Sequence, residues 1–305
     1  MTLTRRPPPL LRTVLVATDF SPAGARAVER TARLPLAPGA AVILVHALPG
    51  RAPREFVEQA RERAGRTLAV IAHELHASLH AAGSNASVEA RLVFGKPALT
   101  LVRQAQSTGA DLVVLGRHGR RPVRDLFLGS TAEHVIRYGQ PPVLVVHGLV
   151  EDRYHRPLVA VDAGETSRRA AEFLPALLEP RTSPRLIHAY ESPLEYMVFP
   201  GLTRDERERY RARFKDSALR ELRPLHWHLD TLGLRYRQAL EHGSPYSVIL
   251  KEARRHRADL LALGTQARSG VSRILLGSVA TDVVREAGCD VLVVRPPATD
   301  RAGGP

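Results

Sequence analysis

The chain has little cysteine, little lysine and no long apolar segment. Among its 305 residues Cys289 is the only cysteine, so an intramolecular disulfide or a zinc site of several cysteines is excluded. The lysines are limited to Lys96, Lys215 and Lys251, so the basic residues are almost all arginines. No run approaches the roughly twenty apolar residues of a membrane helix, and prolines and charges break the N-terminal apolar run too early for a signal peptide. We therefore expect a cytoplasmic protein with no membrane partner.

The chain carries an excess of positive charge, with 44 basic and 31 acidic residues and a formal net charge of +13. Such an excess is common in nucleic-acid-binding proteins. However, the arginines lie three or four positions from glutamates, as in Glu206, Arg209 and Arg213, and no stacking aromatics are interleaved with them. We interpret the charge mostly as compositional bias and expect no nucleic-acid partner. Binding that depends steeply on salt would distinguish this alternative.

The sequence contains an internal repeat. Four pairs of corresponding residues are each 148 positions apart: Asp111 and Asp259, Gly116 and Gly264, Gly129 and Gly277, Leu144 and Leu292. A constant spacing over so many positions indicates a duplicated domain. We place the first domain at residues 9–148 and the second at 155–297, with a polar linker between them.

Each half alternates short apolar runs with helical stretches. The expected strands are 13–19, 41–46, 88–94, 111–115 and 143–146 in the first half, and 158–162, 185–188, 234–240, 259–263 and 291–294 in the second. A long helix is expected from Pro53 to about Gly83, because its apolar residues recur every three or four positions. This alternation predicts α/β domains with parallel sheets covered by helices on both faces.

The segment from Gly116 to Thr131 combines a strand end, a glycine-containing loop and a helix start. Glycine lets the backbone approach a ligand closely, and a helix that opens at Ser130 directs free N–H groups toward a phosphate. Two structural interpretations stay open. Ser130 and Glu133 also fit a capping box, in which the serine only caps its helix, and Gly116 and Gly129 also fit tight turns.

Taken together, these features resemble the universal stress protein family in its tandem form. The resemblance rests on the pattern Gly116-x2-Gly119-x9-Gly129-Ser130, on an aspartate at the end of the first strand of each half, and on the apolar last strands. It implies two open five-stranded parallel sheets with strand order 3-2-1-4-5 and an adenine nucleotide alpha hydrolase-like fold. It also implies that the last strands pair within the chain as a pseudo-dimer, and a homodimer of chains is compatible with that arrangement.

A ligand site is expected between the first and fourth strands. In an open parallel sheet, ligands bind outside the carboxyl ends of the strands where the strand order reverses, and Asp19 and Gly116 end these two strands. The resemblance implies that ATP binds there, and the implied ATP-binding residues are Asp19, Val45, Gly116, Gly119, Gly129, Ser130 and Thr131. Nearby positive charge would come from Arg117, His118, Arg120 and Arg121. The second half offers a weaker candidate site, because Ala267 replaces the glycine found at 119: Asp162, Ile187, Gly264, Gly277 and Ser278.

The leading hypothesis is a universal stress protein that binds ATP, with Mg²⁺ brought by the nucleotide, and regulates a stress response. No activated nucleophile and no pair of catalytic carboxylates is recognisable, so we expect no catalytic residue and at most slow ATP hydrolysis. The alternative is a stress-response scaffold that binds no nucleotide and acts through dimerisation or protein partners. An adenylyl-transfer enzyme ranks lowest, because His118-Gly119 lacks a second histidine. His73, His76 and His80 share a helix face without a further ligand, so no metal site is predicted.

Overall fold

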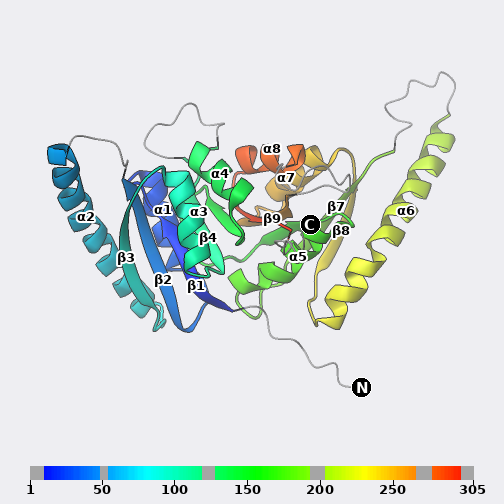
Figure 1. The fold of residues 1–305 in the computed structure, drawn as a ribbon. Helices are drawn as coiled ribbons and strands as arrows, with labels where there is room; N and C mark the ends of the chain where they lie inside the picture. The colour runs from blue at the N-terminus through cyan, green and yellow to red at the C-terminus, as the bar shows by residue number, and fades with distance from the viewer. Residues whose placement is uncertain (1–9, 49–53, 119–127, 193–202, 266–276, 297–305) are drawn as a thin grey trace, which may run out of the picture.

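The computed structural model describes residues 10–48, 54–118, 128–192, 203–265 and 277–296, in which strands and helices alternate through both halves (Figure 1). The elements of the first half are β1 (Leu11–Ala17), α1 (Pro22–Thr31), β2 (Leu36–Leu48), α2 (Arg54–Ala81), β3 (Ser87–Phe94), α3 (Pro97–Ser107), β4 (Leu112–Gly116), α4 (Ser130–Tyr138) and β5 (Val143–Val146). Those of the second half are β6 (Pro157–Ala160), α5 (Glu165–Phe173), η1 (Leu174–Leu177), β7 (Arg185–Tyr190), α6 (Arg204–Thr231), β8 (Arg237–His242), α7 (Pro245–Arg255), β9 (Leu260–Gly264), α8 (Ser278–Glu286) and β10 (Asp290–Val294).

The strands of the described residues form one sheet in the order β3-β2-β1-β4-β5-β10-β9-β6-β7-β8. Within each half the pairing is parallel and follows the order 3-2-1-4-5, so the predicted α/β class and strand order are confirmed. At the centre β5 pairs with β10 in antiparallel fashion, with Leu144 opposite Leu292. The last strands therefore pair within the chain as predicted, and the two expected sheets are joined into a single ten-stranded one.

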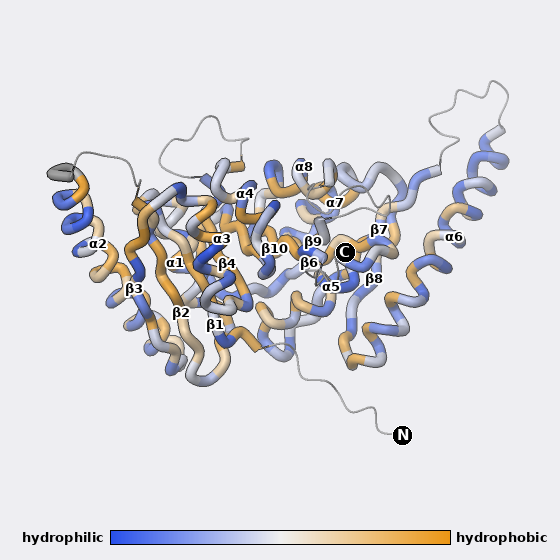
Figure 2. The backbone as a smooth tube through the Cα atoms, viewed as in Figure 1, coloured by the Kyte–Doolittle hydropathy of each residue, from blue (hydrophilic) through white to orange (hydrophobic). Residues whose placement is uncertain are grey.

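Helices cover both faces of this sheet. Alternate side chains of a strand point to opposite faces, so Val14 and Val16 of β1 pack into one core with α1, α2, α5 and α6, whereas Leu15 packs into the other with α3, α4, α7 and α8. Figure 2 shows the resulting pattern, with hydrophobic central strands and a largely hydrophilic α6. Strands buried on both faces explain why the sequence shows continuous apolar runs rather than alternation.

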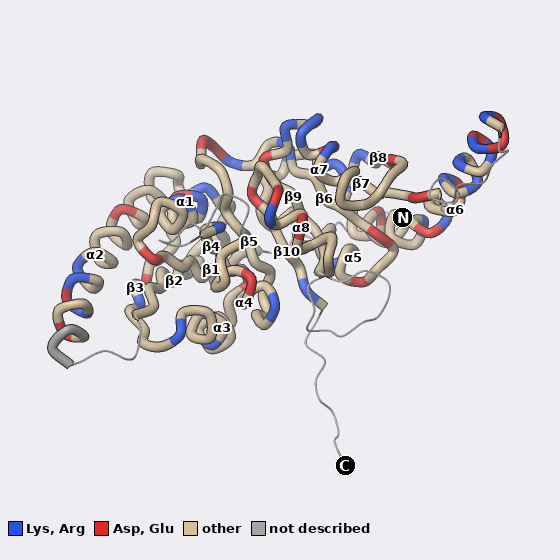
Figure 3. Tube along the Cα trace, turned by 90° about the horizontal axis from the view of Figure 1, so that it is seen from above, with Lys and Arg blue, Asp and Glu red and all other residues tan. Residues whose placement is uncertain are grey.

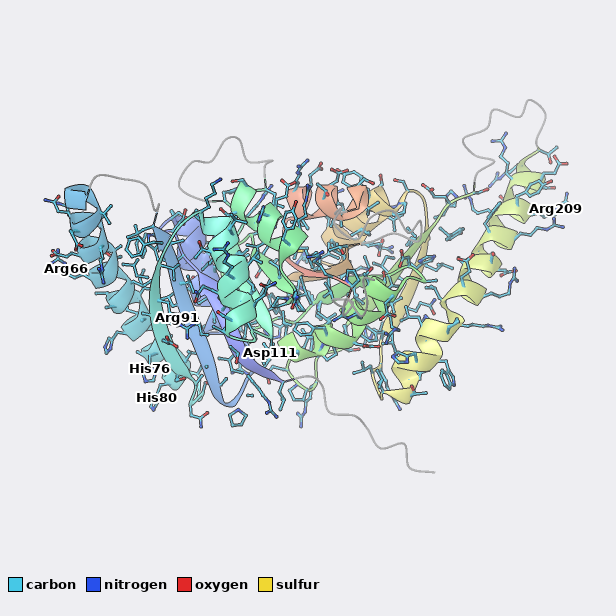
Figure 4. The ribbon with its side chains drawn as sticks, in the orientation of Figure 1. Arg66, His76, His80, Arg91, Asp111 and Arg209 are labelled. Atoms are coloured by element: carbon cyan, nitrogen blue, oxygen red, sulfur yellow. The ribbon has the colours of Figure 1, made fainter. Side chains whose placement is uncertain are left out.

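An aspartate fixes the start of the first strand in each half. The carboxylate Oδ2 of Asp111, just before β4, accepts the backbone N–H groups of Arg12 and Thr13 at 2.8 and 2.9 Å (Figure 4). Asp259, just before β9, accepts the N–H groups of His155 and Arg156 in the same way. These bonds set the register between strands that lie about a hundred residues apart in the chain, which gives this pair of repeated aspartates a structural role.

Most strands differ from their predicted bounds by one or two residues, and two strands differ by three or more at one end. The strand predicted at 234–240 begins only at Arg237, whose N–H donates to the carbonyl of Pro184 at 3.0 Å. Leu234 and Tyr236 instead pack against the core beneath the helices, so their apolar character reflects that contact and not strand pairing. β2 is longer than the predicted 41–46 and ends at Leu48. The last pair between β1 and β2 is Ala17 with Val45, so the final residues of β2 extend beyond the end of β1.

The outer strands of the sheet carry charged side chains. In β3 the Arg91 guanidinium and the Glu89 carboxylate pair at 2.6 Å, and this hydrogen bond lowers the pKa of Glu89. Charged edge strands disfavour the addition of a further strand from another chain. Among the described residues, no helix is both long and apolar enough to cross a membrane.

Candidate functional site

The first candidate site lies at the carboxyl ends of β1 and β4. These strands are direct neighbours, with Val16 paired to Val114, and both end at the same edge of the sheet. Asp19 follows β1 by two residues, Gly116 is the last residue of β4, and α4 begins at Ser130 near the same edge (Figure 1). The structure therefore brings together residues that the sequence separates by almost a hundred positions.

The glycine-containing loop of each half is closed at its neck by a backbone hydrogen bond. Gly129 donates its N–H to the carbonyl of Arg117 at 2.9 Å, and Gly277 donates to Thr265 at 2.8 Å. Gly119, Arg120 and Arg121 lie outside the described residues, as does Ala267 in the second loop. The two loops thus begin and end with the same geometry.

The helix α4 begins without a side-chain cap. Its N-cap residue is Gly129, at φ −61° and ψ 138°, and Ser130 is already the first helical residue. Glu133 pairs with Arg137 at 3.0 Å, so the alternative that Ser130 and Glu133 form a capping box is wrong. α8 begins in the same way, with Gly277 as its uncapped N-cap residue. The first N–H groups of a helix have no partner within it, so these two ends are suited to an anion.

Gly116 and Gly264 have a packing role. A Cβ atom on Gly116 would lie 2.5 Å from the carbonyl oxygen of Ala23, and one on Gly264 would lie 2.5 Å from the Thr166 hydroxyl. The missing side chain therefore lets the first turn of α1 or α5 touch the neighbouring strand. This contact accounts for both glycines without a ligand.

The aspartate of each half is held beside the crevice by local hydrogen bonds. The Oδ1 atom of Asp19 accepts the N–H and the hydroxyl of Ser21, and Ser21 in turn caps α1 by accepting the N–H of Gly24 at 3.1 Å. In the second half Asp162 accepts the N–H of Gly164 at 2.8 Å and the hydroxyl of Ser167 at 2.7 Å. Each carboxylate is thus fixed in position, which suits recognition of a sugar or a base.

A buried histidine at the end of the second strand was not singled out from the sequence. His46 donates from Nδ1 to the carbonyl of Thr18 at 2.8 Å, and the ring of Phe20 stacks on it at 4.0 Å. His188 makes the equivalent bond to Val161 at 2.7 Å. The signal that could have revealed them is a histidine directly after the apolar run of the second strand in both halves.

The backbone of Val45 is already engaged within the sheet. Val45 is fully buried, and its carbonyl accepts the N–H of Thr18 at 3.0 Å. Alternate residues of a strand present their backbone to the same neighbour, so Ala47 is the next to face the β1 side, beyond the last pair between β1 and β2. In the second half Ile187 likewise accepts the N–H of Val161, and Ala189 takes the equivalent place. We therefore add Ala47 and Ala189 to the candidate residues.

Three observations on the described part of the chain concern metal, nucleophile and nucleic-acid chemistry. It contains no group of three or more His, Cys, Asp or Glu residues that could hold a metal ion, and His76 and His80 lie exposed on α2 (Figure 4). Burial, reinforced by Asp290, raises the pKa of the Cys289 thiol to about 12, so it is not a thiolate near neutral pH. Figure 3 shows acidic residues interleaved with basic ones along α6 instead of a continuous basic face.

Comparison with known proteins decides the family. The model described as "Universal stress protein family" matches residues 11–147 and again residues 153–295. The chain belongs to the universal stress protein family. Two universal stress domains in tandem account for the 148-residue repeat and for the shared geometry of the two glycine loops.

Individual universal stress proteins resemble the chain over most of its length. One from Mycobacterium tuberculosis is 28% identical over 256 residues, which cover 77% of this chain and 78% of the relative. The crystal structure of one from Archaeoglobus fulgidus superposes with a TM-score of 0.70 over 93% of this chain and 98% of its own, at 18% identity, and so shares the fold. Another, solved in complex with cAMP, is 31% identical and covers 46% of this chain and 99% of its own, with a TM-score of 0.37.

Proposed function

We propose that this universal stress protein binds an adenine nucleotide, ATP with its Mg²⁺ ion, in the crevice between β1 and β4 of its first half, and acts as a nucleotide-dependent regulator. The observation that carries the proposal is the uncapped N-terminus of α4 facing the same edge as Asp19 and Gly116. The phosphates would lie against the N–H groups of Ser130 and Thr131, since helix N-termini bind anions. Asp19 and the backbone of Ala47 would meet the ribose and the base.

A regulator fits this site better than a fast enzyme. The Asp19 carboxylate is engaged by Ser21, and the one cysteine is a buried thiol far from ionisation. Neither group is poised as a base or nucleophile. At most slow hydrolysis of ATP is expected.

The first half is the better site of the two. Phe20 stacks on His46 beside the first crevice, whereas Ala163 stands at the corresponding position after Asp162. In addition, Ala267 occupies the place in the second loop that Gly119 holds in the first. We therefore propose one strong site and one weak site per chain.

The test compares the same substitution in both halves. Gly129 has a φ of −61° and Gly277 a φ of −56°, which valine adopts without strain, so Gly129→Val and Gly277→Val should both fold. The branched side chain at the start of α4 should block the phosphates, so Gly129→Val should lose ATP binding in titration calorimetry while Gly277→Val keeps the strong site. Retention of full ATP affinity by Gly129→Val would contradict the proposed site.

A scaffold without nucleotide is the second candidate. It is favoured by the packing role of Gly116 and Gly264, which explains part of the glycine pattern without a ligand. Because β5 and β10 are already paired with each other, a homodimer of chains would have to use other surfaces than these strands. Absence of bound nucleotide in the purified protein, together with no uptake of added ATP or AMP, would favour this function.

A further inference from the structure

A half-buried histidine among cationic side chains lies one strand away from the candidate nucleotide crevice. His147 directly follows β5, and Arg117 directly follows β4, so both lie at the carboxyl edge of the sheet. Arg26 comes from α1, which packs over β4 and β5. Three separate segments of the first half therefore meet at this place.

The hydrogen bonds of His147 define which of its ring nitrogens is an acceptor. Nδ1 lies 3.0 Å from the carbonyl oxygen of Ala287. A carbonyl can only accept, so Nδ1 carries the hydrogen and the neutral ring has its lone pair on Nε2. This Nε2 atom is buried and has no hydrogen-bond partner among the described residues. Buried polar atoms are normally satisfied by a partner.

The surrounding charge favours an anion. Burial lowers the pKa of His147 to about 3, and the positive charges of Arg117, His118 and Arg26 contribute to this shift. Asp290 accepts the backbone N–H of His147 with its Oδ1 atom at 2.9 Å. Its Oδ2 atom accepts from Arg30 and from the hydroxyl of Tyr154. The charge of Asp290 is thus already balanced by Arg30, and the groups that face the His147 ring bring mainly positive charge.

Capping of α8 explains only part of this cluster. Arg117 donates from Nη2 to the carbonyl of Arg285, and His147 donates to Ala287, so both satisfy the C-terminal end of α8. At the corresponding place in the other half, Arg295 donates to the carbonyl of Gly139 at 2.8 Å. Capping leaves the Nε2 atom of His147 unexplained, and it leaves Arg26, whose Nε atom is also buried without a partner in the described part of the chain.

We propose that Arg26, Arg117, His118 and His147 form a binding subsite for a phosphate group at the carboxyl end of β5. A phosphate that carries one proton matches the set, because its oxygens accept from guanidinium groups and its P–OH group donates to Nε2 of His147. Free phosphate carries this proton at pH 7.5, whereas the terminal phosphate of ATP offers the same chemistry only after it takes up a proton. The second source extends the proposed nucleotide site, whereas binding of free phosphate tests the subsite on its own.

The first test is a calorimetric titration of the full chain with inorganic phosphate at pH 7.5, using two variants of one residue. His147→Asn keeps a donor for Ala287 and loses the acceptor at Nε2, so its affinity for phosphate should fall about tenfold or more, as for loss of a hydrogen bond to a charged group. His147→Gln places an amide oxygen near the position of Nε2 and should stay within about threefold of the parent. Equal affinities of His147→Asn and the parent would overturn the proposal, and so would equal losses in both variants, which would indicate a capping role only.

A charge control and a second anion sharpen the result. Arg26→Gln should weaken phosphate binding about tenfold, whereas Arg66→Gln, which removes an exposed charge on α2, should leave it unchanged. Sulfate carries no proton at this pH and cannot donate to Nε2, so it should bind about tenfold more weakly than phosphate. Equal binding of the two anions, or equal effects of the two arginine variants, would refute a built site. Circular dichroism would verify that each variant is folded.

The source of the phosphate is then assigned by competition. If ATP displaces phosphate and AMP does not, the terminal phosphates of a bound nucleotide occupy the subsite. If phosphate binds equally in the presence of either nucleotide, the subsite takes free phosphate. Since the titration with phosphate alone needs no nucleotide, its result does not depend on the proposed adenine crevice.

Discussion

The buried ion pair between the two halves offers the sharpest test of how the chain is held together. The guanidinium Nε of Arg30 in α1 lies 2.9 Å from Oδ2 of Asp290, with side-chain exposures of 6% and 3%. The same carboxylate accepts the hydroxyl of Tyr154 at 2.7 Å and the N–H of His147 at 2.9 Å. Asp290→Asn would remove the negative charge and leave the guanidinium buried without its counter-charge.

The expected cost follows from the burial of both partners. Breaking a buried ion pair by removing one partner typically costs about 3–5 kcal/mol, so Asp290→Asn and Arg30→Met should each lower the free energy of unfolding by this amount. The double variant no longer contains an unpaired charge, so its loss should be smaller than the sum of the single losses by about 1–3 kcal/mol. The exposed pair of Glu62 and Arg66, at 3.9 Å, is the matched control, and Glu62→Gln should cost less than about 1 kcal/mol.

Urea unfolding followed by circular dichroism measures these differences. The ion pair joins α1 of the first half to β10 of the second, so its loss should also weaken the coupling of the halves and broaden or divide the transition. If Asp290→Asn stays within about 1 kcal/mol of the parent, the reasoning is refuted. Additive losses in the double variant would show that the two side chains do not stabilise each other.

Three further predictions concern glycine packing, pH and thiol reactivity. Gly116→Ala and Gly264→Ala should each destabilise the fold by about 1–3 kcal/mol, because the added methyl group overlaps a neighbouring turn; unchanged unfolding midpoints would argue against that contact. The pKa of His147 is lowered from 6.5 to about 3 in the folded chain, so between these pH values the unfolded chain binds one more proton than the folded chain. The contribution of His147 to the free energy of unfolding is therefore fully present above pH 6.5 and is lost as the pH falls toward 3. At pH 5 the loss should be about 2 kcal/mol, measured as the difference in acid sensitivity between the parent and His147→Asn, and identical pH profiles would contradict it. Cys289 should react slowly with iodoacetamide until the chain unfolds, because burial raises the pKa of its thiol to about 12, and rapid labelling under native conditions would show otherwise.

The sequence predicts most of the fold because its two periodic signals are strong. The repeat establishes two similar halves, and apolar runs such as Val143 to Val146 predict strands buried on both faces. The boundary of β8 was predicted poorly, since Leu234 and Tyr236 are apolar for a reason other than strand pairing. The pattern of apolar residues indicates which side chains are buried, but it does not indicate which helix or strand buries them.

The sequence predicts which strand ends lie together at the candidate site, and it predicts less of the local backbone geometry there. Asp19, Gly116 and Ser130 meet at one edge because strand order determines which strand ends are neighbours. Ala47 could not be identified from sequence alone, because its position depends on how far β2 extends beyond β1. The capping-box interpretation of Ser130 failed for a related reason: a one-residue shift of the helix start changes which residue is the N-cap.

The contacts across the junction explain what duplication of the domain allows. In a symmetric dimer of single domains every contact occurs twice, because both copies carry the same residues. In this chain the position of the repeat equivalent to the buried Asp290 is Pro142, and the position equivalent to Arg117 is Thr265. The ion pair of Arg30 with Asp290 and the bond from Arg117 to α8 therefore have no equivalent at these two positions. A one-sided network of this kind requires the two halves to differ in sequence. Fusion therefore lets the central pairing of β5 with β10 be fixed by charged contacts that occur only once, and it leaves the two glycine loops free to diverge in sequence.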